Sequence, residues 1–256
     1  MKIRHSLIVC LAACLSALPF NLDAQKRFGI KAGVSVPDLS SDSENIFTQD
    51  FGSISAMGIG IYLNVPISST FSFQPEFLFA VKGGERNGLQ PIPDTRLPSA
   101  FLALFPPGVT PYAEFSNKSV INYLEIPLLL KYTSPGRKGI AVFGGPFIGF
   151  VSGAKQLVSG NSPIFFDPAG TQALMLPGSN VPLDLDFNQD VNIEDEISST
   201  NFGVNAGLDL FTHSGDTKIF FQSALSLGFT KLQNDPRFGE SSVGSVTFSL
   251  GFSQPI

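Results

Sequence analysis

The sequence predicts an all-β fold, an eight-stranded antiparallel transmembrane β-barrel, and three observations support this prediction. Bulky apolar residues alternate with small or polar residues at a period of two, in one segment after another. No strongly amphipathic helix is left to cover one face of a sheet. The connections between the segments alternate strictly between short and long, as they do in barrels with short periplasmic turns and long extracellular loops.

The clearest alternation lies in residues 218–229, KIFFQSALSLGF. One parity is bulky and apolar and is broken only by Ser223, whereas the other holds Phe220 and otherwise small or polar residues. A soluble sheet would need a second layer over its apolar face. A sheet closed on itself, apolar outside and polar inside, satisfies the same pattern within a membrane.

The strands and their connections follow from this alternation. The expected strands are residues 27–36, 52–65, 70–83, 118–132, 139–152, 200–212, 217–230 and 243–253. Tight turns are expected near residues 66–69, 133–138 and 212–216, and long loops over 37–51, 84–117, 153–199 and 231–242. Around Gly144–Pro146 the fifth strand has apolar residues on both parities, so a bulge or kink is expected there.

The first residues have the pattern of an export signal. Residues 1–24 combine a basic start, an apolar core and a cleavage site before Gln25, which predicts a signal peptide followed by a barrel domain over 25–256. Residues 11–14 (LAAC) also match a lipobox, so lipidation of Cys14 stays open as an alternative. The only two cysteines, Cys10 and Cys14, lie in this leader, so the exported chain has no thiol chemistry.

The charge balance of the exported chain excludes one class of partner. Without the leader the chain keeps 14 basic and 20 acidic residues, a net charge of −6. This balance gives no support to nucleic-acid binding. The expected partner is outer-membrane lipid, and no cofactor is predicted.

Six charged residues fall on the parity that faces the barrel interior. They are Lys31, Glu76, Lys82, Glu125, Lys131 and Asp209. An eight-stranded barrel is just wide enough for side chains to fill it, and unpaired charge there would be costly. The sequence therefore predicts a network of paired charges that plugs the lumen, with a narrow ion or proton path as the alternative.

An acidic segment spaces oxygen ligands as a calcium-binding loop does. Its candidate ligands are Asp184, Asp186, Asn188, Asp190 and Asp195. Gln189 stands where the sharp turn of such a loop needs Gly, and no helices flank the segment. A solvated acidic loop is the other interpretation.

No catalytic constellation is apparent in the sequence. Beyond the leader the chain has one histidine, His213, in a predicted turn with Ser214 and Asp216. Turns commonly contain Ser and Asp for backbone bonding, and a base at the tip of a turn has no pocket around it. The sequence predicts that the protein is not an enzyme.

Three motifs resemble one known family. Residues 31–35 (KAGVS), 123–132 (YLEIPLLLKY) and 143–146 (FGGP) resemble the PorT-type outer-membrane β-barrel proteins of Bacteroidota, and the resemblance covers about residues 26–253. It implies an eight-stranded barrel in the outer membrane of a Gram-negative envelope. Founding members are linked to protein secretion and gliding-type machinery, and no catalytic motif comes with the resemblance.

The function expected from these observations is a non-enzymatic outer-membrane barrel whose surface loops bind a ligand or support the envelope. A component of a secretion or envelope-assembly complex, acting through protein contacts, is the first alternative. A transporter of small solutes is the second.

Overall fold

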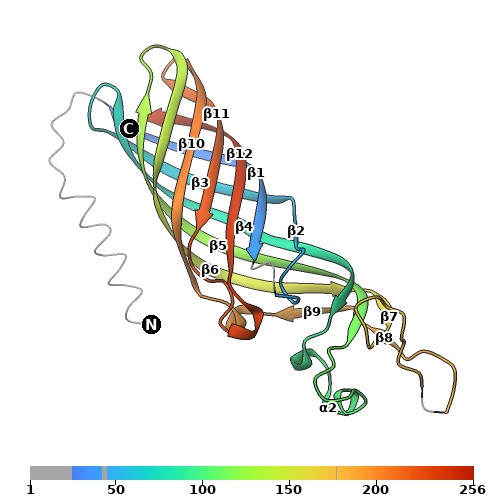
Figure 1. Ribbon diagram of the computed structural model, residues 1–256. Helices are drawn as coiled ribbons and strands as arrows, with labels where there is room; N and C mark the ends of the chain where they lie inside the picture. Colours follow the sequence, from blue (N-terminus) through green and yellow to red (C-terminus); the bar gives the residue numbers. More distant parts are fainter. Residues whose placement is uncertain (1–24, 42–44, 177) are drawn as a thin grey trace.

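The computed structural model describes residues 25–41, 45–176 and 178–256, and in them eight antiparallel strands close into a ring (Figure 1). The predicted leader and Cys14 lie outside the described residues. The order around the ring is β10–β11–β12–β1–β3–β4–β5–β6, and β6 pairs back onto β10. The eight strands are β1 (Arg27–Ser41), β3 (Ala56–Pro66), β4 (Phe71–Pro91), β5 (Tyr112–Thr133), β6 (Lys138–Ser159), β10 (Thr200–Ser214), β11 (Thr217–Gly228) and β12 (Ser241–Pro255). The predicted eight-stranded barrel is confirmed.

Short elements decorate one end of the ring. They are β2 (Gly52–Ser53), β7 (Asn161–Pro163), β8 (Asp184–Asp186), β9 (Gln189–Asn192), α2 (Ser99–Leu102) and the 3-10 turns η1 (Asp94–Arg96), η2 (Glu194–Glu196) and η3 (Pro236–Phe238). Within the described ranges, none of the helices has the length and apolar character needed to cross a bilayer.

The two faces of the wall carry opposite chemistry, as the alternation predicts. On β1, Phe28 and Ile30 are exposed on the outside, whereas Lys31 and Ser35 are buried inside. The same contrast holds on β12, where Phe248 and Leu250 are exposed and Ser249 is buried. Closing the ring pairs every wall strand on both sides, so the hydrocarbon meets apolar side chains and no open sheet edge.

The two ends of the barrel differ in their connections. Three tight turns, residues 67–70, 134–137 and 215–216, lie at one end together with both ends of the strand ring, because Arg27 pairs with Pro255 there. We call this the turn end, and the opposite end the loop end (Figure 1). In outer-membrane barrels the tight turns face the periplasm and the long loops face outward.

The prediction of loops over 84–117 and 153–199 is wrong in part, because strands extend far into both ranges. β4 continues to Pro91, β5 begins at Tyr112, and β6 continues to Ser159, with β9 added at its edge. These extensions form a sheet that projects beyond the rest of the ring (Figure 1). Their outward parity is polar, so they lack the apolar alternation that identifies a membrane-spanning strand.

The expected strand over 52–65 is also wrong at its start. β3 begins only at Ala56, while the separate β2 pairs with β4 at Gly84 and Glu85. β1 therefore pairs with β3 only up to Ser35, and its remaining residues face the segment before β3. Ile54 is buried at this break in the wall.

The irregularity expected at residues 144–146 lies elsewhere. Pairing of β5 with β6 keeps one register from Pro127–Phe147 to Leu130–Gly144, and the shift occurs where Asn122 and Tyr123 meet residues 151–153. Gly145 serves a close approach instead, since a Cβ there would lie 2.0 Å from the Leu128 carbonyl oxygen.

Aromatic rings fill the lumen near the turn end by lying against glycines of the adjacent strand, since Gly29 is paired with Tyr62 and Gly251 with Phe220. A Cβ at Gly29 would lie 2.3 Å from the Tyr62 ring, and one at Gly251 would lie 2.3 Å from the Phe220 ring. These two rings meet edge to face at 5.9 Å, in a cluster with Phe211. The glycines therefore make room for the rings that close this end.

Candidate functional site

The six predicted lumen charges all lie buried on the inner wall and form three ion pairs. Lys31 Nζ lies 2.7 Å from Glu76 Oε2, and Lys82 Nζ lies 2.6 Å from Glu125 Oε1. Lys131 pairs with Asp209, whose side chain is fully buried. Lys82 and Glu125 lie on the neighbouring strands β4 and β5, whereas one strand separates the partners of each of the other two pairs, so those two contacts cross the interior.

Two glutamines join two of these pairs into a closed circuit, which we call the lumen ring. Lys31 donates to Gln222 Oε1 at 2.8 Å, and Gln222 donates to Asp209 Oδ1 at 2.9 Å. On the other side, Lys131 donates to Gln74 Oε1 at 3.2 Å and Gln74 donates to Glu76 Oε1 at 2.7 Å. The parity of the sequence puts both glutamines inside, but it does not identify them as links between the charges.

The lumen ring blocks the barrel with a neutral set of groups. It draws on five strands, β1, β4, β5, β10 and β11, and contains two ammonium groups, two carboxylates and two amides. Burying these charges is tolerable because every one has an opposite charge and a further hydrogen bond.

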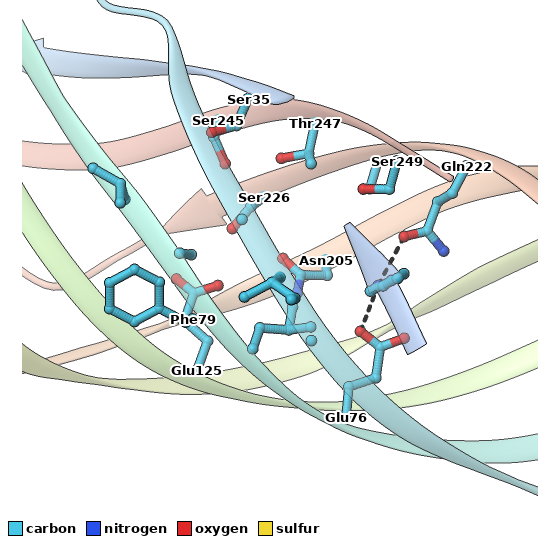
Figure 2. A pocket seen from close by; sticks show the side chains of 18 of the residues that line it. Ser35, Glu76, Phe79, Glu125, Asn205, Gln222, Ser226, Ser245, Thr247 and Ser249 are labelled. Carbon is cyan, nitrogen blue, oxygen red and sulfur yellow. Dashed lines mark hydrogen bonds and ion pairs between the residues drawn. The ribbon is translucent and has the colours of Figure 1, made fainter. Parts of the chain in front are cut away.

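A small cavity of about 70 Å³ lies beside the lumen ring, on the side of the loop end. Figure 2 shows it with Glu76 and Gln222 at one side and Glu125 at the other. Hydroxyl groups of Ser226, Ser245 and other small residues line it. A space of this size holds on the order of two waters, at about 30 Å³ each.

The next layer toward the loop end is apolar, and we call it the apolar floor. Lys82 ends the polar region, its Nζ 5.0 Å from the Phe147 ring centroid and 5.7 Å from that of Tyr123. The apolar floor consists of Ile121, Tyr123, Ala154, Ile193, Ile197, Leu232 and Val243, all buried. It separates the polar lumen from the space above.

Above the apolar floor lies a cavity of about 560 Å³, which we call the outer cavity. One wall is the projecting sheet, through side chains such as Phe115, Asn117 and Gln156. The strands of this wall extend beyond residue 84. Their outward-facing residues are polar, so they lack the apolar alternation by which a membrane strand is recognised in a sequence. Sequence reasoning misses these residues, because Phe115 and Asn117 fall in the expected loop 84–117 and Gln156 falls in the expected loop 153–199.

The opposite wall of the outer cavity is built from two segments, residues 47–51 and 232–241. Phe47 and Phe238 meet edge to face at 5.8 Å, and Thr48 Oγ1 donates to the Phe238 carbonyl at 3.2 Å. Arg86 on β4 donates to the Ile46 carbonyl at 2.8 Å. These contacts hold the segment before β3 across the break in the wall.

The charges around the outer cavity are mostly paired at its rim. Arg96 donates to Glu196 at 2.8 Å, and Arg237 lies 2.7 Å from Asp235 and 3.2 Å from Asp94. Hydrogen bonds from the Arg237 side chain hold the pKa of Asp235 below its ordinary value. The rim therefore offers few free charges to a ligand.

A scan against known families decides what kind of barrel this is. The family model described as outer membrane protein beta-barrel domain matches residues 23–234, most of the chain. The chain belongs to this family. It is a protein of the cell outer membrane.

Solved structures of outer-membrane barrels resemble this family member at low identity. Ail of Yersinia pestis is 11% identical at a TM-score of 0.35, with 90% of this chain and 99% of Ail covered. Neisserial surface protein A is 13% identical at a TM-score of 0.35, with 90% of this chain and 97% of that protein covered. OprG of Pseudomonas aeruginosa is 13% identical at a TM-score of 0.35, with 91% of this chain and 96% of OprG covered. No protein of curated function matches the chain.

The calcium candidates of this barrel are spread along an exposed edge. Asp184 and Asp186 lie on β8, which pairs with β7, whereas Asp190 lies on β9, which pairs with β6. Asn188 donates its backbone N–H and its amide to Asp186 Oδ1, at 2.9 and 2.7 Å. No group of three or more His, Cys, Asp or Glu residues is placed to hold a metal ion in the part of the chain that the structure describes. Asp195 lies apart on η2.

His213 lies near the end of β10, beside the turn at the turn end. Its Nδ1 is 3.2 Å from the Arg137 carbonyl oxygen, and its ring meets Phe211 edge to face at 5.6 Å. Ser214 and Asp216 follow in an exposed turn. The histidine thus contacts backbone and an aromatic ring.

Proposed function

We propose that this outer-membrane barrel is a non-enzymatic binding protein that takes its ligand at the loop end, outside the cell. One observation carries the proposal: an outer cavity of about 560 Å³ lies above a filled lumen. Pockets of roughly 300–1,000 Å³ with mixed apolar and polar linings are typical of small-molecule sites. The apolar floor, the lumen ring and the aromatic cluster at the turn end fill the barrel below this cavity, which favours binding of a ligand over its passage.

The proposal of a non-enzymatic role is supported by the chemistry of the outer cavity. Among the described residues, its lining contains no histidine or cysteine, and its acidic residues lie at the rim. A general base needs a reacting group within hydrogen-bond reach and an enclosed site. His213 lies at the opposite end of the barrel from the outer cavity.

A finer assignment, to the PorT-type proteins, rests on the resemblance of residues 123–132. It leads to a second candidate function, a component of a secretion or envelope-assembly complex. One observation favours it: in the described residues, β4 pairs beyond Glu85 with β5 alone, which leaves a strand edge at the loop end. Such an edge is a template for a partner strand.

Planar-bilayer recording tests the filled lumen, and mild-detergent co-purification separates the two candidates. We expect no steady conductance from the purified barrel, because side chains fill the interior. A reproducible open channel would replace the binding function with transport of small solutes. A stable stoichiometric protein partner from native membranes would favour the assembly role.

A further inference from the structure

We infer that the outer cavity binds an uncharged, largely apolar small molecule that carries a neutral hydrogen-bonding group. This inference rests on the proposed function and specifies the class of its ligand. It follows from the apolar part of the lining of the outer cavity, from its neutral amide side chains and from the placement of its charges.

The walls and base of the outer cavity are dominated by apolar side chains. Phe115 and Phe187 stack at 4.9 Å on one side, and Ile121 and Ile193 of the apolar floor close the base. Val158 and Val191 add aliphatic surface on neighbouring strands of the projecting sheet. Such a lining favours a ligand with an apolar body, since removing apolar surface from water stabilises the complex.

Neutral amides alternate with these apolar residues on the same sheet. Asn117, Gln156 and Gln189 lie on β5, β6 and β9 and line the outer cavity. A neutral hydrogen-bonding group on the ligand would meet these amide side chains without the cost of burying a charge.

The charges disfavour an ionic ligand. Arg96 and Arg237, the basic residues of the lining, are both committed to carboxylates at the rim. Asp195 is exposed to solvent on η2. Among the described residues of the lining, an anion would therefore meet only cations that already have a carboxylate partner, and burying a charge without a partner is costly.

Two matched dyes test this inference. N-phenyl-1-naphthylamine is uncharged and carries one N–H, whereas 1-anilinonaphthalene-8-sulfonate adds a sulfonate to the same body. With the purified, folded barrel in detergent, we expect saturable fluorescence enhancement for the neutral dye and at least tenfold weaker binding for the sulfonate. Equal or tighter binding of the sulfonate would overturn the inference.

Adjacent residues of β5 provide the variant and its control. Ser119 lines the outer cavity, and Val120 has the opposite parity. Ser119→Trp should weaken binding of the neutral dye at least tenfold, whereas Val120→Trp should leave it within twofold. Equal enhancement in both variants would mean that the dye reports only the micelle and would overturn the site.

A second variant keeps the test decisive if Ser119→Trp fails to fold. Val191→Trp fills the outer cavity from β9, which lies outside the ring of eight strands. We expect the same tenfold loss, with the folded barrel confirmed by its altered migration in unheated gels. A non-conducting barrel that binds no neutral dye would overturn this ligand class alone, whereas steady conductance would overturn the proposed binding function.

Discussion

The ammonium of Lys31 on β1 lies 2.7 Å from the Glu76 carboxylate on β4, although β3 separates these strands in the ring. Lys31→Met should therefore leave Glu76 as a buried, uncompensated charge. Breaking a buried pair in this way costs about 3–5 kcal/mol. Urea unfolding of the barrel in lipid vesicles, followed by gel migration, measures the loss.

A double variant separates lost pairing from lost packing. With Lys31→Met and Glu76→Gln together no charge is stranded, so we expect stability within about 1.5 kcal/mol of the wild type, as for replaced buried pairs. If the double variant is as unstable as Lys31→Met alone, the ion pair is not the cause of the loss.

The contact between Gly251 and the Phe220 ring predicts a second stability effect. A Cβ at Gly251 would lie 2.3 Å from Phe220 Cζ and 2.7 Å from the Ile30 carbonyl oxygen. Gly251→Ala should destabilise by about 1–3 kcal/mol, as overpacking does. Gly144→Ala is the matched control, because a Cβ there would lie no closer than 3.6 Å to a neighbouring atom, the Asn205 carbonyl oxygen. Equal losses of stability for the two variants in the same unfolding assay would mean that the contact with the Phe220 ring is not the cause.

The period-two alternation was sufficient to predict the ring of strands and the side of the wall on which each charge lies. It places Lys131 and Asp209 inside, but it does not show that they meet across the lumen, because β6 lies between β5 and β10. That contact depends on how the strands are staggered around the ring, which a single strand does not encode.

The outer cavity could not be predicted from the sequence for a different reason. Membrane-spanning strands are recognised by their apolar outward parity, and this parity becomes polar once β5 leaves the bilayer. The expected strand therefore begins at residue 118, which leaves Asn117 out and makes Ser119 only its second residue, although the ladder with β6 already includes both. The break between β2 and β3 was likewise hidden, since residues 52–65 read as one segment.

On β12, the loss of stability caused by a polar substitution should depend strongly on whether the residue faces lipid or the lumen. Phe248 is exposed near the middle of the strand, where it pairs with Ser223 and Val34 and stacks on Phe221 at 6.2 Å. Phe248→Arg should destabilise by about 2–4 kcal/mol if it meets the bilayer midplane. The adjacent Thr247→Asn, on the inner face, should cost less than about 1 kcal/mol. Unfolding in vesicles compares them, and equal losses would contradict the assignment of the two faces.

The opposite ends of the barrel predict opposite access for a membrane-impermeant maleimide. Ser99 and Ser179 are exposed at the loop end, and Ser69 and Ser214 are exposed at the turn end. Because the tight turns of outer-membrane barrels face the periplasm, Ser99→Cys and Ser179→Cys should react on intact cells. Ser69→Cys and Ser214→Cys should react only after the outer membrane is opened.

The background of this labelling experiment is clean, because the sequence contains no cysteine beyond residue 14. Labelling of Ser214→Cys alone on intact cells would invert the barrel and place the outer cavity in the periplasm, whereas labelling of all four would mean that no membrane separates the two ends.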